Sequence, residues 1–283
     1  MPRLPDFIVI GAMKCATTSL HQYLDQHPQI AMSRPKELRF FVEEHNWHRG
    51  VDWYATHFDE QALLCGESSP AYTKYPVFQG APKRMQQVVP HARLIYLVRD
   101  PIRRILSHYV HRVVAGTETQ PLEQALADLD DNFYVVRSQY HRQLTQYLEY
   151  YSKDQILVVL TEDLQTQPRD VLRTIFTFLG ADPTVPIDHP ATQFHQTRDK
   201  RRPTAAARAI HQTVDRVLAP LSASTRWHLK RVITWPLTRP VERPTLSPEL
   251  NTRLRAYLHT DVEALRAFTE RPLSAWSGPA HVS

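Results

Sequence analysis

An apolar run that stops at a glycine and leads through a lysine into a hydroxyl-rich segment is the feature that most constrains the fold. It reads Phe7-Ile8-Val9-Ile10-Gly11-Ala12-Met13-Lys14-Cys15-Ala16-Thr17-Thr18-Ser19-Leu20. The apolar part predicts a buried strand, and the hydroxyl residues predict a helix start whose backbone N–H groups lack intrahelical partners. Lys14 adds a mobile positive charge. The segment therefore predicts a strand-turn-helix unit that binds a phosphate-like anion, and the candidate ligands are Lys14, Cys15, Ala16, Thr17, Thr18 and Ser19.

The spacing of this turn differs from the pattern of nucleotide triphosphatases. That pattern has four residues between two glycines and then an adjoining Gly-Lys-Ser/Thr. Here only Ala12 and Met13 separate Gly11 from Lys14. We therefore expect a phosphate-like anion other than the β,γ-phosphates and magnesium of ATP.

Apolar runs and helical periodicity alternate along the first 180 residues. Strands are predicted at 7–10, 30–32, 62–67, 93–98 and 155–160, and helices at 17–26, 77–89, around 102–113, 132–151 and 170–179. This alternation predicts an α/β fold with a central parallel sheet flanked by helices and right-handed crossovers. A ligand of such a fold binds at the carboxyl ends of the strands, where Gly11, Glu67 and Arg99 lie.

The length of 283 residues is compatible with a single domain, with a core at 5–180 and a helical, basic C-terminal segment at 181–283. The sequence shows no secretory signal pattern and no run of about 18 apolar residues that would span a membrane. A cytoplasmic location is therefore expected. The two cysteines, Cys15 and Cys65, are expected to be free thiols.

The positive charge of the chain is concentrated in one region. Residues 198–243 hold eleven Lys and Arg against three acidic residues, whereas the formal charge of the whole chain is +5. A basic region on a near-neutral body indicates a polyanionic ligand, an acidic substrate or a nucleic acid. A solvated helical face explains the same pattern equally well.

Four blocks of the sequence together resemble a known family. They are Ile10 to Ser19, Pro35-Lys-Glu37-Leu-Arg-Phe-Phe41, Gly66-Glu-Ser-Ser-Pro-Ala-Tyr72, and Leu97-Val-Arg99-Asp-Pro101 with Ser107 eight residues after the arginine. In this order they resemble the sulfotransferases that use 3′-phosphoadenosine 5′-phosphosulfate (PAPS), and most closely the heparan sulfate branch and its bacterial relatives. The resemblance spans about the first 165 residues and implies a P-loop-like nucleotide-binding fold.

The resemblance assigns roles to the matching residues. It implies that the loop around Lys14 binds the 5′-phosphosulfate and that Lys14 contacts the bridging oxygen. It implies that Glu37 is the general base and that Arg99 and Ser107 hold the 3′-phosphate. Arg39 either faces the acceptor or pairs with a neighbour such as Glu37.

Two departures from the family pattern limit this transfer of roles. Several heparan sulfate enzymes carry a lysine where Ser68 stands, so Ser68 is a candidate substrate contact without a positive charge. Those enzymes also close the nucleotide site with a cysteine-bridged loop that this sequence lacks. The basic segment 198–203 is a candidate replacement, with Lys200 and Arg201 near the 3′-phosphate.

The expected activity is transfer of a sulfuryl group from PAPS to a hydroxyl or amine of a small-molecule or glycan acceptor, with adenosine 3′,5′-bisphosphate (PAP) as product. Neither a metal nor a nucleic-acid partner is expected. His108 and His111 share a predicted helix, but packing or solvation explains them better than metal binding. Two alternatives stay open at this stage: a small-molecule kinase on the same topology, and a non-catalytic polyanion-binding protein.

Overall fold

The computed structural model describes residues 3–187, 201–203, 238–240 and 244–276. Its centre is a five-stranded sheet in the order β2-β3-β1-β4-β5, and every pairing in it is parallel. The strands are β1 (Phe7–Gly11), β2 (Ile30–Met32), β3 (Leu64–Ser68), β4 (Arg93–Val98) and β5 (Ile156–Leu160). The predicted α/β fold with a parallel sheet is confirmed.

Strand β1 lies at the centre of the sheet. Strands β2 and β3 lie on one side of β1, and β4 and β5 lie on the other. The order of the strands therefore reverses at β1, and ligands of open α/β sheets bind beside the carboxyl ends of the strands at such a point. The turn predicted to hold an anion follows β1 directly.

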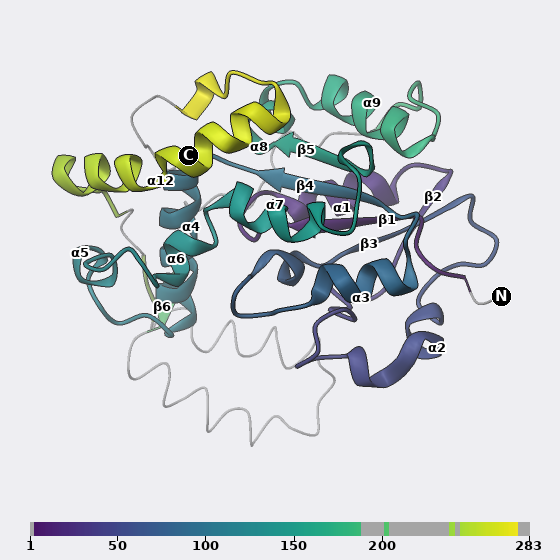
Figure 1. The fold of residues 1–283 in the computed structure, drawn as a ribbon, viewed down its shortest axis with the longest axis horizontal. Coiled ribbons are helices and arrows are strands. Elements are labelled where there is room, and N and C mark those ends of the chain that lie inside the picture. The colour runs from purple at the N-terminus through teal and green to yellow at the C-terminus, as the bar shows by residue number, and fades with distance from the viewer. Residues whose placement is uncertain (1–2, 188–200, 204–237, 241–243, 277–283) are drawn as a thin grey trace.

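Helices cover the sheet on both faces (Figure 1). Helices α3 and α7 contact each other, and His27, two residues after the end of α1, packs against Phe176 of α9 with ring centroids 4.5 Å apart. The longer helices are α1 (Thr17–Asp25), α3 (Ala81–Val88), α4 (Pro101–Ala115), α7 (Tyr140–Leu148), α9 (Pro168–Leu179) and α12 (Pro248–Thr269). The shorter ones are α2 (Gly50–Ala55), α5 (Leu122–Ala125), α6 (Phe133–Val136) and α8 (Thr161–Thr166), with 3-10 turns η1 (Trp47–Arg49), η2 (Pro70–Thr73), η3 (Lys153–Gln155) and η6 (Ser274–Trp276).

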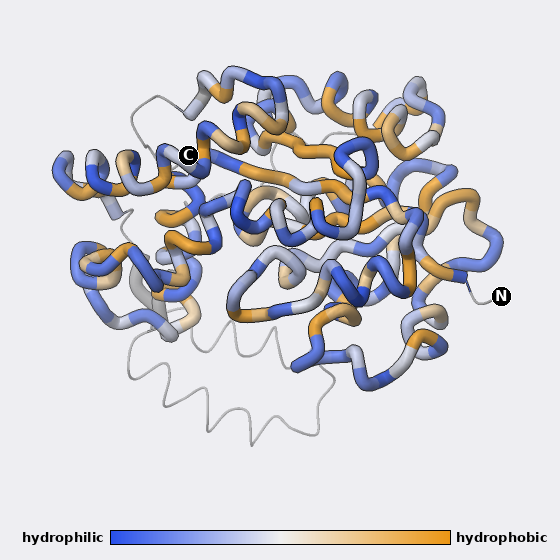
Figure 2. The backbone as a smooth tube through the Cα atoms, in the orientation of Figure 1, coloured by the Kyte–Doolittle hydropathy of each residue, from blue (hydrophilic) through white to orange (hydrophobic). Residues whose placement is uncertain are grey.

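The apolar runs of the sequence form the centre of the core. Strand β1 is buried along its whole length, as expected for a parallel strand covered on both faces. Figure 2 shows the hydrophobic segments gathered in the strands and polar segments on the outer loops. Within the sheet, a Cβ on Gly66 would lie 2.1 Å from the ring of Phe7, so the close packing of β3 on β1 requires glycine there.

One predicted helix was wrong. The pattern over residues 132–151 predicted a continuous helix, but the structure has two, α6 and α7, separated by a break at Ser138 and Gln139. The Ser138 hydroxyl accepts a hydrogen bond from Nε of the buried Arg104 at 2.6 Å and donates to the Tyr134 carbonyl at 3.0 Å. The chain turns around this guanidinium, a tertiary contact that helical periodicity does not encode.

Other boundaries moved by smaller amounts. Helix α3 begins at Ala81 instead of residue 77, because Gly80 precedes it with a φ of 72°.

Most of the basic region 198–243 lies outside the described residues. Its described parts form a two-stranded antiparallel ribbon of β6 (Arg201–Pro203) and β7 (Thr238–Pro240), and β6 lies against α4.

The strand arrows in Figure 1 point toward the side of the molecule where α4, α6 and α12 lie, and the N-terminus is on the opposite side. Within the described ranges, no helix has the length and apolar character needed to cross a membrane.

Candidate functional site

The turn after β1 is held by the strands on both sides of it. The Ala12 N–H donates to the Leu97 carbonyl of β4 at 2.7 Å. On the β3 side, a Cβ on Gly11 would lie 2.0 Å from Oγ1 of Thr73, so only glycine fits at the end of this strand. Lys14 then adopts a φ of 75°, in the left-handed region that non-glycine residues rarely use. The fold thus fixes the backbone of the partly exposed Lys14.

Helix α1 begins immediately after this turn. Ala16 stands at its N-cap with a φ of 60° and, as an alanine, has no side-chain acceptor for the first N–H groups. Thr17, Thr18 and Ser19 form the first turn of the helix, where N–H groups and the helix dipole favour an anion. The geometry predicted for an anion-binding strand-turn-helix unit is present.

Cys15 points away from this anion-binding turn. Its side chain is fully buried, and its sulfur lies 3.6 Å from the Tyr140 hydroxyl. Burial raises the pKa of the thiol to about 11, so it stays protonated and unreactive at neutral pH. Its N–H donates to the Ala12 carbonyl within the turn at 3.1 Å. A cofactor contact by Cys15 stays a prediction that this placement does not favour. Both cysteines are free thiols in the structure.

Arg99 follows β4 at the same edge of the sheet. Its side chain is largely buried, and its N–H faces the Tyr140 hydroxyl at 3.4 Å. The next residue, Asp100, caps α4 by accepting from the Arg103 N–H at 3.0 Å, and its own N–H donates to Glu162 at 2.9 Å. Burial raises the pKa of the Asp100 carboxyl. This capped helix start fixes where Arg99 leaves the strand.

Ser107 lies in α4 two turns after its start and is buried. Strand β6, which begins at Arg201, lies against this helix. A shared role of Arg201 and Ser107 at the 3′-phosphate stays a prediction. Lys200 lies outside the described residues.

Glu37 lies between two cations in the loop after β2. Its carboxylate accepts from Lys36 Nζ at 2.9 Å and from Arg39 Nη2 at 3.0 Å. Burial on its own would raise the pKa of Glu37, but the hydrogen bonds and charges of Lys36 and Arg39 outweigh it, and the net pKa is lowered. Glu37 is therefore ionised at neutral pH. Of the two possibilities for Arg39, the structure has the ion pair with Glu37.

The end of β3 supports the Glu37 loop. The Ser68 carbonyl accepts from the Glu37 N–H at 3.1 Å, and the Ser69 hydroxyl accepts from the Arg39 N–H at 3.0 Å. The Ser68 side chain is fully buried, and its hydroxyl has no hydrogen-bond partner among the described residues. Substrate contact by Ser68 stays a prediction, whereas its carbonyl positions Glu37.

Glu67, at the same strand end, is a structural carboxylate. It is fully buried and accepts from the hydroxyls of Ser69, Tyr54 and Tyr72 at 2.5 to 2.8 Å. Burial raises its pKa despite these hydrogen bonds. Tyr54 and Tyr72 are therefore core residues that hold this carboxylate.

Two cationic residues at this edge, Arg104 and Lys74, were not predicted from the sequence. Arg104 is fully buried, and its Nη2 donates to the Tyr134 carbonyl at 2.6 Å while Nη1 lies 3.5 Å from the Met13 carbonyl of the anion-binding turn. Lys74 follows η2 and is half-buried. Neither belongs to a sequence motif that marks it, because both depend on contacts between distant segments.

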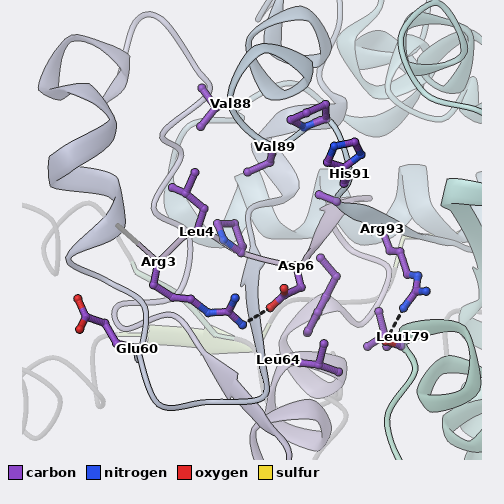
Figure 3. A pocket seen from close by; sticks show the side chains of 14 residues that line it. Arg3, Leu4, Asp6, Glu60, Leu64, Val88, Val89, His91, Arg93 and Leu179 are labelled. Carbon is purple, nitrogen blue, oxygen red and sulfur yellow. Dashed lines mark hydrogen bonds and ion pairs between the residues drawn. The ribbon is translucent and has the colours of Figure 1, made fainter. Parts of the chain in front are cut away.

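A large cavity lies elsewhere. It has a volume of about 1090 Å³ and opens at the amino ends of β1 and β4, opposite the edge described above (Figure 3). Two of its arginines are engaged within the protein, since Arg3 pairs with Asp6 and Arg93 donates to the Leu179 carbonyl. None of the predicted site residues lines it. Among the described residues, no group of three His, Cys, Asp or Glu could hold a metal ion.

The doubly wound sheet, the turn after its central strand and the cations around it define an α/β protein whose fold is suited to binding an anionic ligand at this edge. Residues 4–266 match the family model of the sulfotransferase domain. The chain belongs to this sulfotransferase family and is an enzyme of that kind.

Similar proteins agree with this assignment. The chain is 30% identical over 205 residues to the human bifunctional heparan sulfate N-deacetylase/N-sulfotransferase 2, a match that covers 64% of the chain and 22% of that protein. It is 40% identical over 133 residues to the membrane-associated sulfotransferase kil1 of Dictyostelium discoideum, covering 44% of the chain and 27% of that protein. The chain thus spans about a quarter or less of these curated relatives.

A solved structure matches nearly the whole chain. The sulfotransferase from Alicyclobacillus acidocaldarius superposes with a TM-score of 0.71 at 25% identity, covering 98% of this chain and 100% of that one. The fold is therefore one that a known sulfotransferase adopts.

Proposed function

We propose that this protein transfers a sulfuryl group from PAPS to a hydroxyl or amine of a small-molecule or glycan acceptor. The observation that carries the proposal is the convergence of three groups at one edge of the sheet. These are the anion-binding turn at Lys14, the strand-end Arg99 and the ionised Glu37. An anion-binding turn next to a carboxylate fits transfer of a sulfuryl group from an anionic donor, in which the carboxylate accepts the proton that the acceptor loses.

The donor groups at this edge match the chemistry of PAPS. Lys14 and the first turn of α1 would hold the 5′-phosphosulfate, since charged and backbone donors both favour such an anion. Arg99 and Ser107 would hold the 3′-phosphate, and Arg201, in the strand β6 that lies against α4, would add a further cation. Arginine suits a phosphate dianion because its guanidinium can donate two parallel hydrogen bonds.

The proposed reaction uses the protein groups as follows. The donor supplies a sulfuryl group whose bond to the phosphate oxygen breaks while the acceptor oxygen or nitrogen bonds to sulfur. Lys14 would donate to the bridging oxygen, where negative charge develops, and Glu37 would accept the proton that the acceptor loses. The lowered pKa of Glu37 keeps it in the ionised form that can accept this proton.

The acceptor is the least constrained part of the proposal. The name of the human relative gives it an N-sulfotransferase activity toward heparan sulfate, and the match covers 64% of this chain. An amine of a glycan is therefore one candidate acceptor, and a hydroxyl of a glycan or small molecule is the other. An acceptor panel with labelled sulfate in PAPS distinguishes them.

Replacement of Lys14 tests the catalytic part of the proposal. We expect Lys14→Ala to lower the transfer rate by about 10²- to 10³-fold, the typical loss when one preorganised donor at developing charge is removed. The measurement is labelled sulfate transfer to the best acceptor of the panel. Lys83→Ala is the matched control, because Lys83 is an exposed lysine on α3. A folded Lys14→Ala protein with full activity would remove Lys14 from the mechanism.

A further inference from the structure

A cation at the site that the family resemblance does not assign is Lys74. It directly follows η2, and the residues on either side of it are held by buried contacts. The Thr73 hydroxyl packs on Gly11 and donates to the Ile10 carbonyl at 3.3 Å. On the other side, the buried Gln143 side chain accepts from the Tyr75 N–H at 2.9 Å and donates to the Tyr75 carbonyl at 2.8 Å. The backbone of Lys74 is therefore fixed between the anion-binding turn and α7.

The side chain of Lys74 is half-buried without an acidic partner. Its Nζ lies 5.7 Å from the centre of the Phe78 ring, and no carboxylate of the described residues forms an ion pair with it. Holding an ammonium group partly out of water without a counter-ion costs free energy that an anionic ligand could offset.

The charges that act on Lys74 come from both the Glu37 loop and the surroundings of the anion-binding turn. Burial, together with the charges of Arg137, Arg39 and Arg104, lowers the pKa of Lys74 to about 8, while Glu37 opposes this shift. Arg104 reaches the Met13 carbonyl of the anion-binding turn, and Glu37 is the proposed base. Lys74 is thus electrostatically coupled to both.

The pKa of the neighbouring His45 is lowered in part by the same excess of positive charge. Burial lowers the pKa of His45, and the charges of Arg39 and Lys74 lower it further, while Glu44 opposes them. His45 also packs edge-on against Phe78, the ring next to Lys74. The groups that face Lys74 are therefore four cationic or basic residues and one carboxylate, Glu37.

We propose that Lys74 is a further catalytic residue whose ammonium group donates to an oxygen of the sulfuryl group that is being transferred. This proposal rests on the function proposed above. Lys74 supplies the second positive charge that the neutral, buried Ser68 does not provide. With Lys14 at the bridging oxygen and Lys74 at the sulfuryl oxygens, the moving group lies between two cations and the base.

A binding experiment tests this without knowledge of the acceptor. PAPS and PAP differ by the sulfuryl group alone, so loss of Lys74 should weaken PAPS selectively. We expect Lys74→Met to lower the affinity for PAPS about tenfold in calorimetry and to leave the affinity for PAP within about twofold. Unchanged PAP binding also reports that the variant is folded. Lys83→Met is the matched control and should change neither affinity.

The pH dependence separates a charge contact from a structural role. Because the pKa of Lys74 is about 8, wild-type affinity for PAPS, relative to PAP, should fall as the pH rises past about 8 and the ammonium loses its proton. Lys74→Arg keeps its charge at those pH values, so this fall should disappear. If the wild-type protein binds both nucleotides and Lys74→Met has the same ratio of PAPS to PAP affinity as the wild type, the role of Lys74 alone is overturned. If the wild-type protein binds neither nucleotide, the proposed function is overturned and this inference with it.

Discussion

Four non-glycine residues at the candidate site adopt left-handed backbone conformations. Lys14, Ala16, Glu37 and Arg39 all have φ between 50° and 75° without being glycine. Each such residue costs about 1 to 3 kcal/mol unless its surroundings compensate, and such residues cluster where side chains must be aimed. The two short loops that carry the proposed clamp and the proposed base are therefore held in shape by the sheet beneath them.

The two cations at Glu37 lead to a prediction about its titration. Removing one of them should raise the pKa of Glu37, because Lys36 and Arg39 are what hold it below its ordinary value. We therefore expect Lys36→Met to move the Glu37 carboxyl titration to higher pH in a carbon-13 NMR experiment. Lys83→Met should leave that titration in place. If Lys36→Met also leaves the Glu37 titration unchanged, Lys36 does not control the protonation of Glu37.

Between elements, the buried Arg104 joins α4 to the segment between α6 and α7. Its guanidinium contacts the Ser138 hydroxyl, the Tyr134 carbonyl and the Met13 carbonyl, all neutral oxygens. Burial lowers the pKa of Arg104, which indicates how much the charged form depends on these acceptors. The contact of Arg104 with the Met13 carbonyl also supports the anion-binding turn.

This junction predicts a stability change. Ser138→Ala leaves the Arg104 Nε without its hydroxyl acceptor in a dry environment, which should cost about 1 to 3 kcal/mol. The free energy of unfolding from urea titration measures it. Thr174→Ala is the control, because Thr174 is exposed on α9 and donates only to the Asp170 carbonyl of its own helix. Equal stability of the two variants would show that Arg104 does not depend on Ser138.

For the molecule as a whole, the sheet topology brings distant segments to one edge. The turn after β1, the loop after β2, the end of β3 and the start of α4 all follow carboxyl ends of parallel strands. Four sequence blocks that are up to about 90 residues apart therefore converge without any long-range pairing signal. The large cavity at the amino ends of the strands takes no part in this convergence.

The apolar runs were sufficient to predict the sheet, because parallel strands buried on both faces are continuous hydrophobic segments. The alignment of Gly11, Glu67 and Arg99 at strand ends followed from that alone. The ion pair of Glu37 with Arg39 was one of two alternatives for Arg39, and the ion pair with Lys36 was not predicted, because both depend on the left-handed backbone of the loop. Lys74 and Arg104 were missed for a related reason, since their importance arises from burial by other segments.

The central claim is that this edge binds a nucleotide with a 3′-phosphate instead of a nucleoside triphosphate with magnesium. Calorimetry of the wild-type protein with PAP and, separately, with ATP plus magnesium tests it most directly. The proposed roles of Lys14, Arg99 and Ser107 predict saturable binding of PAP and at least tenfold weaker binding of magnesium ATP. Tighter binding of magnesium ATP, or no binding of PAP, would contradict the assignment of these residues to a sulfuryl donor.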